Sequence, residues 1–199
     1  MQDIRIEDLC KSYGSKTVLH HFSCIIPSGT VTGLMAPSGA GKTTLLRILM
    51  GFEQADSGKI HGLDSLRLSA VFQDDCLCEN LSPVSNIRLV SRGLSKEDAK
   101  AALVSVGLAD CLQQPVCELS GGMKRRVAIL RALLAEYDFL ILDEPFKGLD
   151  EKTKALVIQD TRSRCTGKTV LFVTHDAEEL ISMGAVKTLT LGCVSSENA

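Results

Sequence analysis

Residues 36–44, APSGAGKTT, combine small residues with a lysine and two threonine hydroxyls. The stretch matches the end of the pattern G-x-x-x-x-G-K-[ST] through Gly41, Lys42 and Thr43, but Ala36 stands where the pattern begins with glycine. A turn of this kind exposes backbone N–H groups, and the lysine adds a positive charge, so the stretch predicts a phosphate-binding loop. A plain Gly-rich turn before a helix is the alternative.

The segments on either side of this loop favour the phosphate-binding interpretation. Residues 31–35 form a short apolar run that predicts a buried strand, and residues 44–50 show the leucine spacing of an amphipathic helix. A strand, a glycine turn and a helix in succession direct the first N–H groups of the helix at an anion. Lys42 would then hold the β- and γ-phosphates of a nucleotide, and the Thr43 hydroxyl would bind Mg²⁺.

The run FLILDEP, residues 139–145, places two carboxylates after four apolar residues. A buried parallel strand delivers such residues to the sheet edge at which ligands bind. We expect Asp143 to hold the Mg²⁺ shell and Glu144 to polarise a water that attacks the γ-phosphate. The alternative is a strand that ends in two acidic residues at the surface of the protein. This alternative is less favoured because a lysine-containing loop is predicted on the same sheet.

A third stretch, LSGGMKRRVAILRALLA, covers residues 119–135 and has the stripe of an amphipathic helix. Ser120 is a good N-cap, and Gly121 and Gly122 would let another backbone or ligand approach closely. The start of this helix is a second anion site. One triphosphate rarely needs two separate cradles, unless the second serves a different molecule.

The rest of the chain alternates short apolar runs with helical patterns, which indicates an α/β fold. Helical signals replace strand signals between residues 74 and 119, where one helix is predicted to start at Ser95 and stop at Gly107. We expect a P-loop NTPase core with a parallel sheet, an N-terminal antiparallel β flap and an inserted helical subdomain. The predicted strands are residues 4–8, 18–26, 31–35, 69–72, 139–142, 169–173 and 186–191, the first two forming the flap.

Composition and charge narrow the possible partners. The 199 residues carry a net charge of −2, without the basic excess that a nucleic-acid surface needs. We find no signal peptide and no run of about 20 apolar residues, so we expect a single cytosolic domain. The eight cysteines form no C-x-x-C pair and are expected to be free thiols, with a soft-metal or redox pair at Cys76 and Cys78 as the alternative.

Five motifs, in this order and spacing, resemble the nucleotide-binding subunit of ATP-binding cassette (ABC) transporters: APSGAGKTT, the glutamine of VFQDD, LSGGM, FLILDEPFKGLD and VTHD. The resemblance covers nearly the whole chain, and Leu-Ser-Gly-Gly upstream of the acidic strand is specific to this family. It implies an ATPase that uses ATP and Mg²⁺ in a head-to-tail dimer of two copies. Through separate integral membrane permease subunits it would drive solute import from the cytoplasmic side, peripheral on the inner face of the cell membrane.

The resemblance also implies a division of the chain and a set of roles. Residues 1–199 would be one nucleotide-binding domain, with 1–73 and 136–199 as catalytic core and 74–135 as helical subdomain and signature helix. Each ATP would lie between the phosphate loop of one subunit and the Leu-Ser-Gly-Gly helix start of the other. The implied nucleotide contacts are Pro37, Ser38, Gly39, Ala40, Gly41, Lys42, Thr43 and Thr44 in one subunit and Ser120, Gly121 and Gly122 in the other.

Four more positions take roles from the resemblance. Gln73 is implied to reach Mg²⁺, together with Thr43 and Asp143, and to touch the attacking water. His175 is implied to hydrogen-bond the γ-phosphate and to orient Glu144. Asp150 matches a loop that contacts the dimer partner, although it equally suits a helix N-cap, and Tyr13 matches the aromatic that stacks on adenine, although a turn tyrosine needs no ligand.

Two residues depart from the family pattern. Ala36 replaces a glycine, and we expect weaker nucleotide affinity at most, because Pro37 already favours extended backbone before it. Met123 replaces a glutamine, as in importers of the nitrate, sulfonate and taurine type, which is the subgroup the chain resembles. Only 24 residues follow His175, so we expect no C-terminal regulatory domain.

The sequence leaves three other functions open. The first is a non-transport cassette ATPase acting on nucleic acid or ribosomes, the second a P-loop kinase, and the third a catalytically silent regulator. Leu77, Leu81 and Val84 also have two interpretations, since they would either accept a helix of a membrane partner or fill the core of the helical lobe.

Overall fold

The computed structural model describes residues 2–37, 39–91 and 93–191. Its N-terminal part is an antiparallel sheet in which β1 (Ile4–Tyr13) and β2 (Lys16–Ile26) form a hairpin and β4 (Ser57–His61) pairs with the other edge of β1. This confirms the predicted antiparallel flap. β4 was not predicted, because its sequence SGKIH is mostly exposed and gives almost no alternating hydrophobic signal.

The second sheet is parallel throughout, with the strand order β5-β6-β7-β3-β8. β6 and β7 are buried on both faces, which explains why their sequences FLILD and TVLFV are continuous apolar runs. The predicted parallel strands are found at their expected places, which confirms the fold class. The bounds are β3 (Val31–Met35), β5 (Leu68–Val71), β6 (Phe139–Asp143), β7 (Thr169–Val173) and β8 (Lys187–Thr190).

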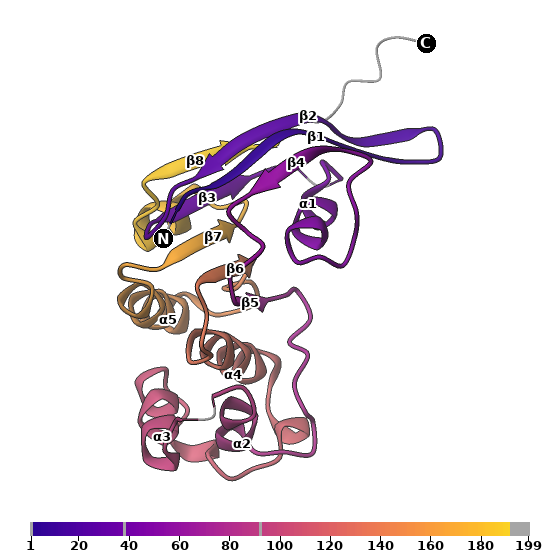
Figure 1. Ribbon diagram of the computed structural model, residues 1–199. Helices are drawn as coiled ribbons and strands as arrows, with labels where there is room; N and C mark the ends of the chain where they lie inside the picture. The colour runs from indigo at the N-terminus through magenta and orange to yellow at the C-terminus, as the bar shows by residue number, and fades with distance from the viewer. Residues whose placement is uncertain (1, 38, 92, 192–199) are drawn as a thin grey trace.

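The helices cover both faces of the parallel sheet and form a lobe at one end of the molecule (Figure 1). In this view α4 lies between the sheet and the lobe that holds α2 and α3. Ser95 and Ser120 accept backbone N–H groups as N-caps, as predicted. The helices are α1 (Lys42–Leu49), α2 (Pro83–Arg88), α3 (Lys96–Ser105), α4 (Gly121–Leu133), α5 (Glu151–Arg164) and α6 (Ala177–Met183), with 3₁₀ turns at Ala109–Cys111 and Val116–Glu118.

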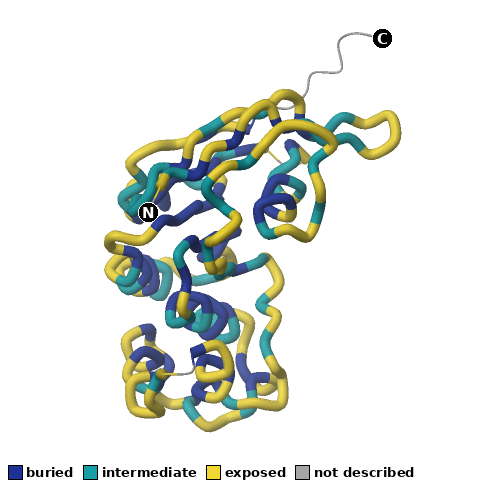
Figure 2. Tube along the Cα trace, in the orientation of Figure 1, coloured by how far each residue is buried: buried dark blue, intermediate teal, exposed yellow. Residues whose placement is uncertain are grey.

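Alternation along β6 divides the hydrophobic core into two clusters. Leu140 and Leu142 belong to the cluster that continues into the helical lobe, whereas Phe139 and Ile141 belong to the cluster beneath the antiparallel sheet and α1. The buried segments therefore run through the whole height of the molecule (Figure 2). Because the helical lobe shares a core with the sheet, α4 is held firmly against the strands that end at the predicted site.

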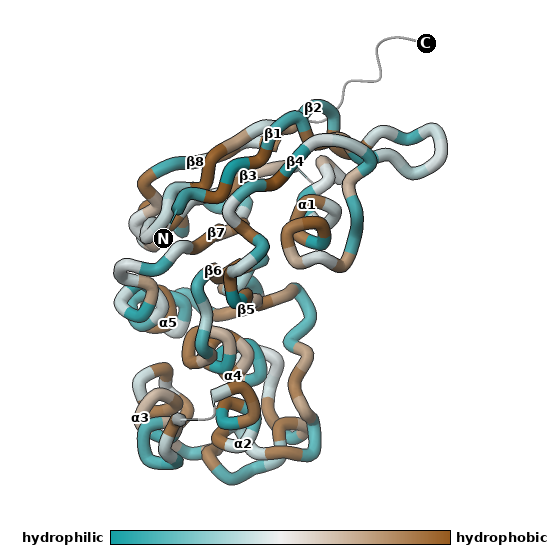
Figure 3. The backbone as a smooth tube through the Cα atoms, in the orientation of Figure 1, coloured by the Kyte–Doolittle hydropathy of each residue, from teal (hydrophilic) through white to brown (hydrophobic). Residues whose placement is uncertain are grey.

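The three residues with two interpretations divide between core and surface. Val84 is 3% exposed, and Leu77 is partly buried against the same core, so both help to fill the helical lobe. Leu81 is 37% exposed. The tip of the β1–β2 hairpin, residues 13–16, is exposed (Figure 2) and lacks hydrophobic colouring (Figure 3).

Candidate functional site

Four neighbouring strands of the parallel sheet lead to the predicted site. β5 is followed by Gln73, β6 ends in Asp143 and is followed by Glu144, β7 leads to His175, and β3 leads to the loop at 36–41 before α1. Because parallel strands point the same way, their carboxyl ends share one edge of the sheet. The fold thus brings candidate site residues that are far apart in the sequence to one edge of the parallel sheet.

The phosphate-loop candidates surround the start of α1. Lys42 turns back across the loop, and its Nζ donates hydrogen bonds to Ala36 O at 2.7 Å and Pro37 O at 3.4 Å. Gly41 caps α1 with a φ of 91°, and a Cβ there would meet Val18 O at 2.9 Å, so only glycine fits. Ala36 has no positive φ, so its backbone does not require a glycine.

The remaining members of the loop are distributed as follows. Thr43 is exposed and Thr44 partly buried in the first turn of α1. Pro37 and Gly39 are exposed, and Ala40 is buried. Ser38 lies outside the described residues. The hydroxyl and N–H groups of the loop therefore meet at the start of α1, where a helix favours an anion.

Asp143 has the properties of a cation ligand. It is 7% exposed, and its Oδ1 has no hydrogen-bond partner among the described residues. Burial raises the pKa of the Asp143 carboxyl, and the negative charge of Glu144 raises it further, while Lys42, Arg125 and Lys147 oppose the rise. A buried carboxylate oxygen without a partner is costly unless a cation or a donor satisfies it. An oxygen ligand of this kind fits Mg²⁺.

Glu144 is held in a left-handed backbone conformation, with φ 45°. Its Oε1 lies 3.5 Å from His175 Nδ1, and its Oε2 lies 3.1 Å from Lys147 Nζ. Burial alone would raise the pKa of Glu144, but Lys147 and His175 outweigh it and lower the pKa below the ordinary value. The carboxylate is therefore ionised near neutral pH, the form that accepts a proton.

The structure adds two residues that the sequence did not single out, Lys147 and Arg125. Lys147 pairs with Glu144 as just described. Arg125 is buried beneath the site and donates hydrogen bonds to backbone oxygens of Gln73 and Glu144, among others. Arg125 is one of three consecutive basic residues on a helix, so neither spacing nor composition distinguished it from Lys124 and Arg126, which are only partly buried.

The start of α4 is open to an approaching group. Ser120 Oγ accepts from Met123 N at 3.4 Å, a Cβ on Gly121 would meet nothing within 4 Å, and one on Gly122 would find Leu149 Cδ2 no closer than 3.5 Å. A pocket of about 280 Å³ lies beside this helix start. Its described lining is Gln73, Asp75, Gly121, Gly122, Arg125, Glu144, Lys147 and Gly148, without any residue of the phosphate loop.

Tyr13 and Asp150 are satisfied within the chain. Tyr13 is 45% exposed at the hairpin tip, and the Nζ of Lys11 lies 5.3 Å from the centre of its ring. Asp150 Oδ1 accepts from Thr153 N at 3.0 Å as the N-cap of α5, so the predicted capping role is present. The structure does not by itself bring either residue to the phosphate loop.

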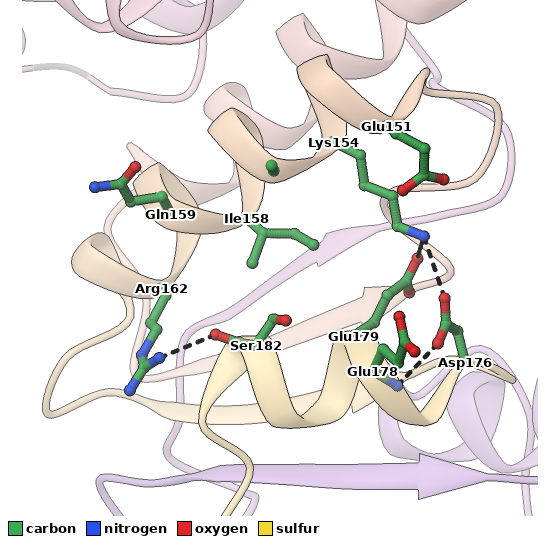
Figure 4. Close-up of a pocket in the computed structure, with 10 residues that line it drawn as sticks. Glu151, Lys154, Ile158, Gln159, Arg162, Asp176, Glu178, Glu179 and Ser182 are labelled. Atoms are coloured by element: carbon green, nitrogen blue, oxygen red, sulfur yellow. Dashed lines mark hydrogen bonds and ion pairs between the residues drawn. The ribbon is translucent and has the colours of Figure 1, made fainter.

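A larger surface pocket, of about 390 Å³, lies between α5 and α6 (Figure 4). In it Lys154 bridges Asp176 at 3.2 Å and Glu179 at 2.9 Å, and Glu179 accepts from Thr174 Oγ1 at 2.7 Å. Thr174 immediately precedes His175, so this network braces the histidine loop. None of the predicted nucleotide contacts is among the described residues that line this pocket.

Two further features, membrane-spanning helices and clusters of metal ligands, concern the described residues only. Within the described ranges, no helix is both long and apolar enough to cross a membrane. The same part of the chain holds no group of three or more His, Cys, Asp or Glu residues arranged for a metal ion. Its cysteines are unpaired, and Cys76 and Cys78 are both exposed; Cys193 lies outside the described residues.

Comparison with known proteins agrees with this geometry. Residues 19–147 match the family model described as ABC transporter. The chain is 37% identical to the spermidine/putrescine import ATP-binding protein PotA of Treponema pallidum, covering 90% of this chain and 52% of that protein. It is 39% identical to the Fe(3+) ions import ATP-binding protein FbpC of Agrobacterium fabrum, over 89% and 55% of the two chains.

This chain covers a larger share of a third relative. The aliphatic sulfonates import ATP-binding protein SsuB of Pectobacterium atrosepticum is 39% identical, over 90% of this chain and 71% of that protein. The chain thus spans about half the length of the first two relatives and more of the third.

A solved structure supports the fold. A bacterial Atm1-family ABC exporter with ATP bound superposes with a TM-score of 0.84 at 24% identity, over 96% of this chain and 37% of that one. The predicted resemblance to ATP-binding subunits of importer type is confirmed by the import proteins among the relatives. On the family match across most of its length, together with these relatives, this chain belongs to the ABC transporter family.

Proposed function

We propose that the chain is the ATP-hydrolysing subunit of an ABC importer. The observation that carries the proposal is the convergence of the Lys42 loop, Gln73, Asp143, Glu144 and His175 at the ends of four adjacent strands. The import ATP-binding proteins among the relatives support the same activity and direction. Those relatives have different solutes in their names, so the proposal leaves the solute open.

In this proposal the phosphate loop binds the triphosphate of ATP. Lys42 exchanges its bonds to the loop carbonyls for bonds to the β- and γ-phosphates, and the N–H groups of residues 39–44 complete the cradle. Thr43, Gln73 and Asp143 would hold Mg²⁺, which when bound neutralises charge on the β- and γ-phosphates. The unpartnered Oδ1 of Asp143 supports this role.

Glu144 is the proposed general base. Its ionised carboxylate accepts a proton from the water that attacks the γ-phosphorus, while the bond from that phosphorus to the bridging oxygen breaks and ADP leaves. Gln73 helps to place the water. His175, 3.5 Å from Glu144 Oε1, orients the carboxylate and reaches the γ-phosphate. Tyr13 is the proposed adenine contact, which requires it to exchange its interaction with Lys11 for the base.

The second anion cradle supports a dimer. Gly121 and Gly122, which follow Ser120, line a pocket whose described lining lacks the phosphate loop, which supports their contact with an ATP held by another copy. We propose a head-to-tail homodimer in which these residues and Asp150 complete the partner's site. Integral membrane permease subunits would carry the solute, with the dimer peripheral on the inner face of the membrane and no direct contact to nucleic acid. Within each copy, residues 1–73 and 136–199 form the proposed core and 74–135 the helical part.

Glu144→Gln tests the proposed chemistry. The substitution keeps the shape of the side chain but removes the base, so we expect turnover of ATP to fall about 100-fold, the usual scale for a lost general base. Affinity for ATP, measured by nucleotide titration, should remain. Glu97→Gln, on an exposed face of α3, is the matched control and should keep full turnover. Wild-type turnover in the Glu144→Gln protein would refute the role of Glu144.

A further inference from the structure

Arg125 uses its guanidinium to hold two chain segments that end at the site. Nε donates to Pro145 O at 2.8 Å, and Nη2 donates to Asp143 O at 3.0 Å and Glu144 O at 2.8 Å. Nη1 donates to Phe72 O and to Gln73 O at 3.3 Å. The same nitrogen lies 3.1 Å from Asp75 Oδ1. One side chain from α4 therefore joins the loop after β5 to the loop after β6.

This arrangement needs an arginine. The side chain is only 6% exposed, and a charge so buried is costly unless its donors are matched. The planar guanidinium offers five N–H donors in a fixed fork, which here meet five backbone carbonyls and one carboxylate. Lysine would bring the charge but not the fork. Methionine would leave buried carbonyl groups without donors.

The hydrogen bond from Arg125 to Glu144 O is important because the backbone of Glu144 has an unusual conformation. A glutamate with φ 45° is held in a region that side-chain-bearing residues rarely occupy, and such strain persists only where neighbours enforce it. On the N–H side, Glu144 donates to Val173 O at 2.9 Å. On the carbonyl side, Arg125 Nη2 at 2.8 Å holds it. One hydrogen bond therefore holds the Glu144 backbone on each side, and Arg125 supplies the bond to its carbonyl oxygen.

We propose that Arg125 is a positioning residue that fixes Gln73 and Glu144 relative to the first turn of α4. The inference rests on the proposed function, since it concerns the step that Glu144 would catalyse. Among the described residues, none of the hydrogen bonds of Arg125 goes to the phosphate loop, so we place its role in the chemical step and not in the capture of ATP. α4 begins with Gly121 and Gly122, which would contact the partner's ATP. The hydrogen bonds of Arg125, on the same helix, therefore connect this helix start to Glu144, the proposed base of the same chain.

The test compares Arg125→Met with Arg131→Met. Arg131 lies on the same helix and donates to Asp75 O and Cys76 O, so its loss also removes bonds to the loop after β5 but none to Gln73 or β6. We expect Arg125→Met to lower kcat about 100-fold, the scale of a misplaced catalytic group, with ATP affinity within about twofold of wild type. Arg131→Met should keep kcat while lowering thermal stability.

Two further variants make the result decisive. Arg125→Lys keeps the charge and part of the bonding, so kcat should recover to between the Met variant and wild type; it also serves if the Met variant does not fold. In the Glu144→Gln background, Arg125→Met should cause a much smaller further loss than it causes in wild type, because only its hydrogen bond to Gln73 still serves a catalytic group. A wild-type kcat in Arg125→Met or Arg125→Lys, a parallel loss of ATP affinity, or an additive double variant would each overturn the inference.

The two proposals fail differently. If Glu144→Gln keeps wild-type turnover, the proposed general base is wrong whatever Arg125 does. If Glu144→Gln is inactive while the folded Arg125 variants turn over normally, the proposed function stands and the positioning role of Arg125 is wrong.

Discussion

Glu144 receives opposite influences from the groups around it. Burial disfavours its charge, while Lys147 and His175 favour it. Lys147 is 66% exposed and Glu144 10% exposed in their side chains, so the ion pair sits at the boundary between site and solvent. In this structure the Lys147 ammonium therefore forms an ion pair with Oε2 of the proposed base.

Lys147→Met should release that oxygen. Because the lysine end of this ion pair is exposed to solvent, we expect the pair to contribute about 1 kcal/mol and basal ATP turnover to rise by about two- to fivefold, with ATP affinity unchanged. Steady-state kinetics of the purified protein measure the effect. Lys152→Met, an exposed lysine on α5, is the control and should behave as wild type. A drop in turnover after Lys147→Met would mean that the lysine assists the reaction.

At the residue scale, the sequence predicted the groups whose chemistry depends on a local motif. Lys42, Asp143 and Glu144 each stand in a short pattern with a recognisable flanking strand. The contacts of Arg125 and Lys147 arise only on folding, which places Arg125 against a backbone oxygen 19 residues away in the sequence and Lys147 against a carboxylate across a tight turn. No periodicity in one sequence marks such contacts.

At the scale of elements, the best predicted strands were those buried on both faces. β6 and β7 consist of continuous apolar residues, so their position needs no knowledge of their neighbours. β4 was missed because its residues are exposed and an edge strand takes its pairing from β1. The short helices α2 and α6 depend on their Ser82 and Asp176 caps and on packing more than on periodicity.

An ion pair joins the starts of β5 and β6, at the ends of these strands that lie away from the site. Arg67 Nε and Nη2 donate to the two carboxylate oxygens of Asp138, at 3.0 and 3.1 Å. Hydrogen bonds from the Arg67 side chain and backbone lower the pKa of Asp138 from 3.8 to about 2. Since the folded pKa is the lower one, the charge stabilises the fold above pH 3.8, and this contribution is lost as the pH falls toward 2.

Asp138→Asn tests the pairing at this end of the sheet. At pH 6 the variant should have a lower free energy of unfolding than wild type, and the difference should shrink as the pH falls from about 4 toward 2. Urea unfolding at a series of pH values measures it. A difference that stays constant with pH would show that the carboxylate charge contributes nothing. The turnover of ATP at neutral pH should not change, because the pair lies at the far end of the strands.

At the scale of the whole molecule, the two anion cradles remain apart within one chain. The phosphate loop begins α1, and the Ser120 cradle begins α4, on elements that belong to different core clusters. The sequence indicated both cradles, but their separation is a product of the topology. The proposed dimer follows from that separation and from the family, and it stays a prediction.

Ser120→Ala distinguishes the cradle from a plain helix cap. Ser95→Ala is the matched control, because Ser95 caps α3 in the same way. Both variants should lose about 1 kcal/mol of stability. Only Ser120→Ala, made in the Glu144→Gln background, should weaken the ATP-dependent dimer, by about tenfold or more for a lost hydrogen bond to a charged group. Sedimentation at several protein concentrations measures the dimer, and equal affinity in both variants would contradict the proposal.

The central position of β7 has a mechanical consequence. Its last residue, Val173, receives the N–H of Glu144 from one side, while Thr174, the residue after it, donates to Leu34 O on the other at 3.3 Å. β7 therefore connects the end of β6, which carries Asp143 and Glu144, to the end of β3, which leads to Lys42. Neither end can move away from the other without breaking hydrogen bonds of the parallel sheet.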